Sequence, residues 1–133
     1  MNTIKATITD IKSVDNLNIV TFKSNGLSLK MMSLDLSSAI EIGKDVVLYV
    51  KPTAVGIGKN LSGMLSYSNR LNAVIKTVNN GKLLSTISLK IDDTVLESII
   101  TVDSSKMMEL KVKDEVVVLI KSSDLYIMKE KDA

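Results

Sequence analysis

Short segments in which apolar and polar residues alternate dominate the chain. In the first half these segments are ATITDIKSV, NIVTFKS, GLSLKMMSL and DVVLYVKPTAVGIG. In the second half they are NAVIKTV, LSTISLKI, TVLESIITV and DEVVVLIKSSDLYIM. Alternation with a period of two, in segments rich in Val, Ile and Thr, is typical of β-strands that bury one face. The pattern therefore predicts about five short strands in each half.

The two halves of the chain repeat each other. The apolar positions of the first predicted strand recur 67 residues later, where Ile4, Ala6, Ile8 and Ile11 align with Leu71, Ala73, Ile75 and Val78. Towards the end of each half the spacing is 70 residues, where Ile42, Val46, Lys51, Val55 and Ile57 align with Val112, Val116, Lys121, Leu125 and Ile127. The three additional residues fall in the loops between these segments. Self-similarity at a nearly constant spacing indicates a tandem duplication.

Each half also contains a helical segment before its last strands, LDLSSAIEIGK in the first half and VDSSKMMELKVKD in the second. Asp35 and Asp103, which are followed by serines, are suitable N-cap residues for these helices. Five short strands and one short helix in about 65 residues are typical of a small Greek-key barrel of the OB type. The sequence therefore predicts an all-β fold with one short helix per repeat, arranged as two tandem OB-like five-stranded barrels.

The boundary between the repeats is predicted from composition. Repeat 1 spans residues 1–60 and repeat 2 spans residues 61–133, and the Gly/Ser/Asn-rich segment at about 58–66 forms the linker. A barrel of this size buries little apolar surface by itself. We therefore expect each barrel to be covered by its twin or by another chain.

Composition excludes several kinds of site and partner. The chain has no Cys and no His, which rules out thiol and imidazole catalysis and the usual zinc sites. It also lacks a Gly-rich phosphate-binding loop, so it is predicted not to be an enzyme. No apolar run approaches the roughly 18 residues of a membrane span, and a cytoplasmic protein without a membrane partner is expected. A net charge of +2 and 3% aromatic residues argue against a nucleic-acid partner.

Hydrogen-bond donors collect at a few places in the sequence. In both repeats a lysine and a hydroxyl residue follow a strongly apolar strand: Lys51 and Thr53 in the first, Lys121 and Ser122 in the second. Other donors precede the first strand of repeat 2 or lie near its helix: Ser66, Ser68, Asn69, Arg70, Thr101 and Ser104. A donor-rich pocket with a fixed positive charge suits a small anion whose oxygens only accept hydrogen bonds. The alternatives are solvated surface charges for the lysines and Arg70, helix caps for Thr101 and Ser104, and ordinary linker residues for the rest.

Four stretches of repeat 2 carry a resemblance to a known family. They are SYSNRL at 66–71, ITVDS at 100–104, KVKDEV at 111–116 and IKSS at 120–123. In the same order they resemble the motifs Ser-Ala-Arg-Asn-x-Leu, Ile-Thr-x-Glu-Ser, Lys-Val-Gly-Lys-Glu-Val and Ile-Lys-Ala-Ser of the Mop domain. This domain forms the molbindins, which are small molybdate- and tungstate-binding proteins, and is related to the TOBE domain of molybdate transporter ATPases.

The chain departs from the family pattern at two places. Ser68 stands where the family has arginine, and Arg70 follows two residues later. The first repeat begins MNTIKATI and is expected to lack the Ser-Ala-Arg-Asn motif. It retains Lys51-Pro52-Thr53, which is similar to the Lys-Pro-Thr variant of the transporter relatives.

The resemblance implies a function and an assembly. Molybdate or tungstate is expected as the bound ligand, without direct metal coordination by side chains, in a protein that stores the oxyanion or maintains its level. The sites are expected between subunits, with the Ser-rich strand start from one chain and the Lys-Ser corner from another. Doubled molbindins favour a homotrimer, and the related transcription regulators make a homodimer the alternative.

Three other interpretations remain open from the sequence. The chain resembles the oxyanion-sensing effector module of a molybdate-responsive transcription regulator equally well. The change at Ser68 is also compatible with an assembly module that has lost its ligand. The last alternative is a ligand-free OB-type module that binds nucleic acid.

Overall fold

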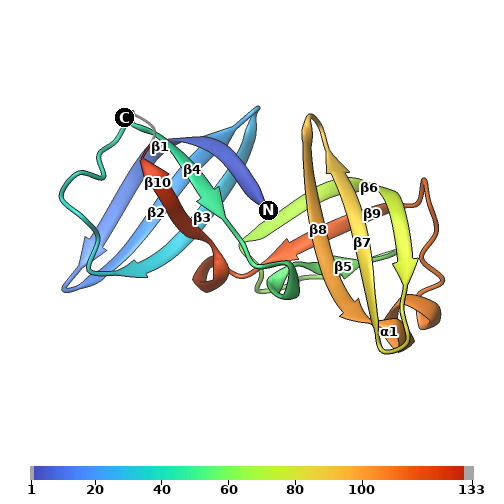
Figure 1. Cartoon of the computed structure of the whole chain (residues 1–133). Helices are drawn as coiled ribbons and strands as arrows, with labels where there is room; N and C mark the ends of the chain where they lie inside the picture. Colours follow the sequence, from blue (N-terminus) through green and yellow to red (C-terminus); the bar gives the residue numbers. More distant parts are fainter. Residues whose placement is uncertain (1, 131–133) are drawn as a thin grey trace.

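Strands make up most of the protein, whose computed structural model describes residues 2–130. In chain order the elements are β1 (Thr3–Val14), β2 (Leu17–Ser24), β3 (Leu27–Leu34), β4 (Asp45–Tyr49), η1 (Pro52–Ala54), β5 (Gly56–Gly58), β6 (Asn69–Asn80), β7 (Leu84–Ile91), β8 (Thr94–Thr101), α1 (Val102–Met107), β9 (Glu115–Ile120), η2 (Ser122–Asp124) and β10 (Tyr126–Glu130). The strands form two curled five-stranded sheets that lie next to each other (Figure 1). The predicted arrangement of two small β-barrels is confirmed.

Each barrel takes one strand from the other half of the chain. The strand order is β10-β4-β1-β2-β3 in the first sheet and β5-β9-β6-β7-β8 in the second. Strand β10 pairs with β4, with Tyr126 opposite Tyr49, and β5 pairs with β9, with Gly56 opposite Leu119. The two crossings are equivalent positions of the duplication, because Tyr126 lies 70 positions after Gly56 and Leu119 lies 70 positions after Tyr49. The barrels therefore do not coincide with the sequence repeats at 1–60 and 61–133.

A 3-10 helix forms the corner at which the chain crosses between the barrels. Lys51 and Lys121 precede these helices and have extended backbones, with ψ of 139° and 146°. At the first corner Pro52 favours this conformation, since the proline ring excludes the helical region for the residue before it. The carbonyls of Lys51 and Lys121 accept hydrogen bonds from the N–H groups of Ala54 and Asp124, at 2.8 and 2.9 Å. The lysines of the predicted site thus mark the two crossing points.

The core follows the alternation that predicts the strands. In β6 every second residue from Asn69 to Ile75 is buried. A bulge interrupts β6 between Ile75 and Thr77, and β1 has one at the equivalent place between Ile8 and Asp10. Bulges bend strands and increase their twist, which helps each sheet to curl around its own core. The largest fully buried side chains are Phe22, Ile8, Leu29, Leu48, Ile75, Ile87, Leu89, Leu96, Ile120, Leu125, Val20 and Val46.

The expectation of a short helix in each repeat is wrong for the first repeat. Within residues 2–130 the one α-helix is α1, in the second repeat. Asp35, the expected N-cap of the first helix, has φ of 53° in the left-handed region, whereas an N-cap needs an extended backbone. In the second repeat the N-cap is Thr101, two residues before the expected Asp103. The Thr101 hydroxyl accepts a hydrogen bond from the Ser104 N–H at 3.2 Å.

Candidate functional site

The two Lys-hydroxyl corners have the same local structure. Lys51 and Lys121 are exposed, Ser122 is half-buried and Thr53 is exposed. Each hydroxyl residue lies within a 3-10 helix, whose first backbone N–H groups have no partner inside the turn. Pro52 has no N–H, so the first corner offers one backbone donor fewer than the second. Each corner therefore combines a flexible cation, a hydroxyl and backbone donors, which is the chemistry that an oxyanion requires.

The start of β6 lies at the same end of the second barrel as the Lys121 corner. Strand β6 pairs with β9 from Asn69 opposite Ile120. Ser68 and Lys121 flank this pair, so the register brings them to one end of the sheet. Arg70 is opposite Leu119 on the same two strands and is exposed, as are Ser66 and Ser68. The structure therefore brings the strand start and the corner together within one chain.

Asn69 has a different role from the other members of the predicted site. Its side chain is fully buried, with a relative exposure of 0%. The side-chain oxygen accepts a hydrogen bond from the Lys30 N–H at 2.7 Å, and the side-chain nitrogen donates to the Lys30 carbonyl at 2.9 Å. Lys30 belongs to β3 of the other barrel, so Asn69 joins the start of β6 to an edge strand of its neighbour. Both polar ends of the amide are occupied by the protein itself.

The first repeat contains the counterpart of this asparagine, which the sequence comparison missed. Asn2 is buried, accepts a hydrogen bond from the Glu97 N–H at 2.8 Å and donates to the Glu97 carbonyl at 2.7 Å. Asn2 lies 67 residues before Asn69, and its partner Glu97 lies 67 residues after Lys30, the partner of Asn69. The first repeat therefore keeps the asparagine of the Ser-Ala-Arg-Asn motif, which the sequence comparison had expected it to lack. Extending the 67-residue offset back to Asn2 would have found it.

Thr101 and Ser104 lie at the opposite end of the second barrel from Lys121. Thr101 pairs with Leu84, next to the end of β6 at Asn80. Strand β6 has 12 residues, so at about 3.3 Å per residue its two ends are on the order of 30 Å apart along the strand. Figure 1 shows α1 at the end of the second barrel that faces away from the first barrel. One chain therefore does not bring all the predicted residues into one pocket.

The carboxylates near these groups differ between the two corners. Asp124 is the last residue of η2 and is half-buried, three positions after Lys121. Its counterpart at the first corner is Ala54, which carries no charge. A carboxylate repels an anion, so the second corner combines more hydroxyls with one opposing charge. Asp124 was not among the residues that the sequence indicated for the site.

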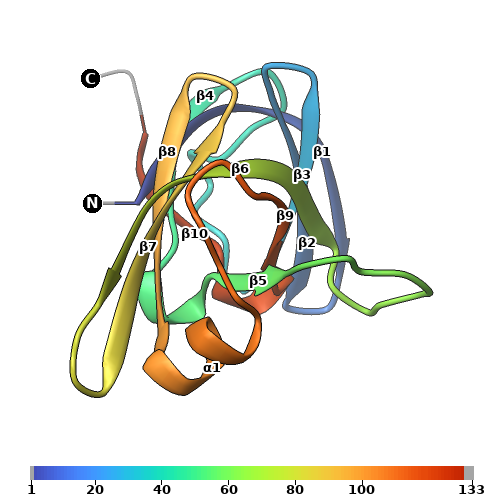
Figure 2. The same ribbon diagram turned by 90° about the vertical axis from the view of Figure 1, so that its right-hand side faces the viewer.

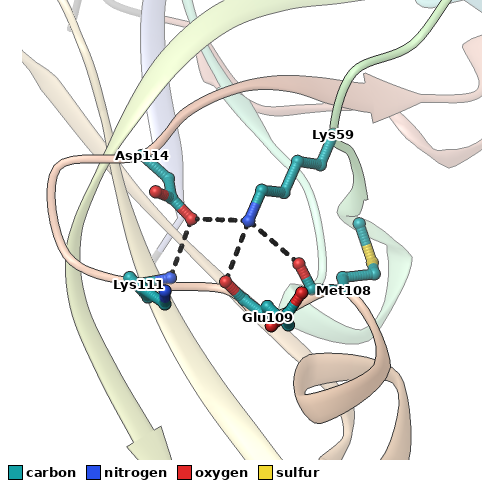
Figure 3. A network of polar contacts seen from close by, with 5 residues as sticks. All are labelled: Lys59, Met108, Glu109, Lys111 and Asp114. Carbon is teal, nitrogen blue, oxygen red and sulfur yellow. Dashed lines mark hydrogen bonds and ion pairs between the residues drawn. The ribbon is translucent and has the colours of Figure 1, made fainter.

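A network of polar contacts fixes the linker to the second barrel (Figure 3). The Lys59 ammonium donates to the carbonyls of Met108 and Glu109 at 3.0 and 2.9 Å and lies 3.1 Å from the Asp114 carboxylate. The same Asp114 oxygen accepts a hydrogen bond from the Lys111 N–H at 2.9 Å. The Lys111 hydrogen bond and then Lys59 lower the pKa of Asp114 below its ordinary value, since both stabilise the charged form.

Replacing Asp114 with asparagine is expected to reduce the free energy of unfolding at neutral pH and not in acid. A carboxyl whose pKa is lowered on folding stabilises the fold above its unfolded-state pKa of about 3.9, and this stabilisation disappears as the pH falls through the folded-state pKa. Urea unfolding of both proteins between pH 7 and pH 3 measures the difference. Asp92→Asn, at an exposed turn, is the control. A difference that persists unchanged at the lowest pH would contradict the assignment.

Metal ligands and membrane spans are not evident in the part of the chain that the structure describes. Within residues 2–130 no three carboxylate, thiol or imidazole side chains gather to hold a metal ion. The helices in that range are also too short to cross a membrane.

Comparison with known proteins gives one matching family and a full-length structural relative. Residues 65–127 match the TOBE domain family. No curated protein matches the chain in sequence. Among solved structures the chain is similar to the cytoplasmic molybdate-binding protein ModG in a form with molybdate bound. The TM-score is 0.89 at 25% sequence identity, and the similarity covers 95% of this chain and 95% of that chain.

These two findings confirm the resemblance drawn from the four short motifs. The TOBE match lies on the repeat that carries them, and the structural similarity extends over both barrels. Both relatives are binding modules, which also confirms the prediction that the chain is not an enzyme. Residues 65–127 therefore match the TOBE domain family, and the chain as a whole has the fold of the molybdate-binding protein ModG, with two OB-like barrels.

Proposed function

We propose that this protein binds molybdate or tungstate in the cytoplasm and serves to store the oxyanion or to maintain its level. The observation that carries the proposal is the similarity to molybdate-bound ModG over 95% of both chains. The chemistry of the corners supports it. Molybdate at neutral pH is a tetrahedral dianion whose oxygens only accept hydrogen bonds. Lysine ammonium, serine hydroxyl and backbone N–H groups can all donate such bonds to it.

The proposed ligands are a subset of the residues that the sequence indicates. Lys121 and Ser122, together with Ser68 and Arg70 at the adjoining strand start, form the principal cationic group in this proposal. Lys51 and Thr53 form the weaker group at the first corner. Asn69 is left out, because its amide is buried and bonded to Lys30.

The sites are proposed to lie between chains. The hydroxyls of Thr101 and Ser104 lie at the far end of the barrel from Lys121, so one chain cannot close them around the same ion. Lys51, Lys121, Ser68 and Arg70 are all exposed to solvent in the single chain. An ion that must exchange its hydration shell for protein donors needs contacts on several sides. A second chain placed against the corner supplies them, and a homotrimer is the preferred assembly.

Calorimetric titration of the protein with three oxyanions tests the proposal. Molybdate and tungstate are expected to bind tightly and sulfate much more weakly, because a cavity shaped for the larger ions holds sulfate with longer hydrogen bonds. Sulfate has the same charge and shape and is therefore the matched control. The proposal is wrong if neither metal oxyanion gives heat, or if sulfate binds as tightly as molybdate.

A further inference from the structure

One buried residue of β8 breaks the apolar pattern of the core. Ser98 has a relative exposure of 0% and follows the buried Leu96 at the next inward-facing position of the strand. A hydroxyl taken out of water needs a hydrogen-bond partner, because an unpaired one costs stability. The Ser98 hydroxyl donates to the carbonyl of Val55 at 2.5 Å. Val55 comes directly after η1, so this bond ties β8 to the corner that carries Lys51.

The first corner is attached to β8 on both of its sides. Figure 2 shows η1, in green, beside β8. Before the corner, the Val50 N–H donates to the Asn2 carbonyl at 3.2 Å, and the Asn2 amide is bonded to the backbone of Glu97. After the corner, the Val55 carbonyl is bonded to Ser98. Two neighbouring residues of one strand therefore hold both ends of the first corner.

The second corner keeps the asparagine attachment and loses the serine attachment. The position equivalent to Ser98 is Met31, which lies 67 residues earlier and is also buried. The two residues have the same place in the sheet register, opposite Ile87 and Val20, which are 67 residues apart as well. A methionine thioether has no hydrogen to donate. Met31 therefore cannot hold the carbonyl of Leu125, the residue that follows the second corner.

We propose that Ser98 is a positioning residue for the first corner, an inference that rests on the proposed function. Its bond keeps η1 at one place on β8, so less of the backbone around Lys51 and Thr53 has to be ordered when an oxyanion binds. This matters most at the first corner, which has fewer donors than the second. The two corners of one chain then differ in order as well as in charge, since the first is held at both ends and the second at one.

Amide hydrogen exchange measured by NMR tests the attachment without any ligand. The N–H groups of Ala54 and Asp124 make equivalent hydrogen bonds inside the two corners, to the carbonyls of the two lysines. After correction for intrinsic rates, Ala54 is expected to exchange more slowly than Asp124. Ser98→Ala should raise the rate at Ala54 about three- to tenfold relative to the core amides, because one hydrogen bond is lost. Ser85→Ala, at a serine of β7 that is also 0% exposed, is the matched control and should leave this ratio unchanged.

Calorimetric titration measures whether the attachment acts on binding. In a Lys121→Ala background, which leaves the first corner, Ser98→Ala is expected to weaken molybdate binding about three- to tenfold. In a Lys51→Ala background, which leaves the second corner, it should have no effect. Equal losses in both backgrounds, or an Ala54 amide that exchanges as fast as Asp124, would overturn the positioning role. Absence of heat from the unsubstituted protein would instead refute the proposed function, and the exchange measurement would still decide whether Ser98 fixes the corner.

Discussion

Replacing Asn69 with alanine is expected to lower the free energy of unfolding by about 2–4 kcal/mol, measured by urea or thermal denaturation. The Asn69 amide bonds to both the N–H and the carbonyl of Lys30, at a position with 0% exposure. Alanine leaves the part-buried N–H and carbonyl of Lys30 without their partner, and a polar group left unpaired out of contact with water costs about 1–3 kcal/mol. Asn72→Ala on the exposed face of the same strand is the matched control and should change stability little.

The same variant separates a structural role for Asn69 from a ligand role. If the amide joins the barrels, Asn69→Ala loses stability, and the protein that remains folded still binds oxyanion. Asn69→Asp should be at least as destabilising, since it replaces the donor with a buried charge. Normal stability together with lost oxyanion binding would show that Asn69 belongs to the ligand set and that its bonds to Lys30 matter little.

Replacing Lys121 with alanine is expected to weaken molybdate binding about ten- to a hundredfold in calorimetric titration. A hydrogen bond to a charged group contributes about 1.5–3 kcal/mol, and each 1.4 kcal/mol is a factor of about ten in affinity. Lys121 is exposed in the single chain, so its loss should leave the unfolding transition unchanged. Lys12→Ala, at an exposed lysine of β1, is the control for general loss of positive charge.

The corresponding change at the first corner is expected to have a smaller effect. Lys51 is followed by one hydroxyl residue, Thr53, whereas Lys121 is followed by two, Ser122 and Ser123, so the first corner offers an anion fewer donors. A second difference acts in the other direction. The Asp124 carboxylate repels an anion at the Lys121 corner, whereas its counterpart at the Lys51 corner, Ala54, has no charge. Equal losses at both lysines would mean that the carboxylate offsets the added hydroxyls, and a larger loss at Lys51 would reverse the proposed ranking.

The sequence indicated the two lysine corners of the candidate site because they recur with the duplication. Lys51 and Lys121 stand at equivalent positions after equivalent apolar strands, and the structure places both at equivalent corners. The pattern could not show which donors were already engaged. An asparagine that binds an oxyanion and one that is bonded to the protein cannot be told apart by residue type. The contact of Asn69 with Lys30 depends on a strand that lies 39 residues away in the sequence. Hydrogen-bond partners of that kind become visible when the two barrels are seen together.

The sequence by itself determined the strands, the duplication and the core, because each depends on a local period. Alternating residues such as Leu71, Ala73 and Ile75 bury one face of β6 whichever strand lies beside it. Tertiary structure alone decided that β5 joins the sheet of the second half of the chain and that β10 joins the sheet of the first half. Backbone hydrogen bonds between strands are the same in kind for any partner, so an apolar strand specifies its buried face and leaves its neighbour open. The chain crosses between the barrels at the extended corners of Lys51 and Lys121. The helix expected after Asp35 is absent, and the backbone of Asp35 lies in the left-handed region.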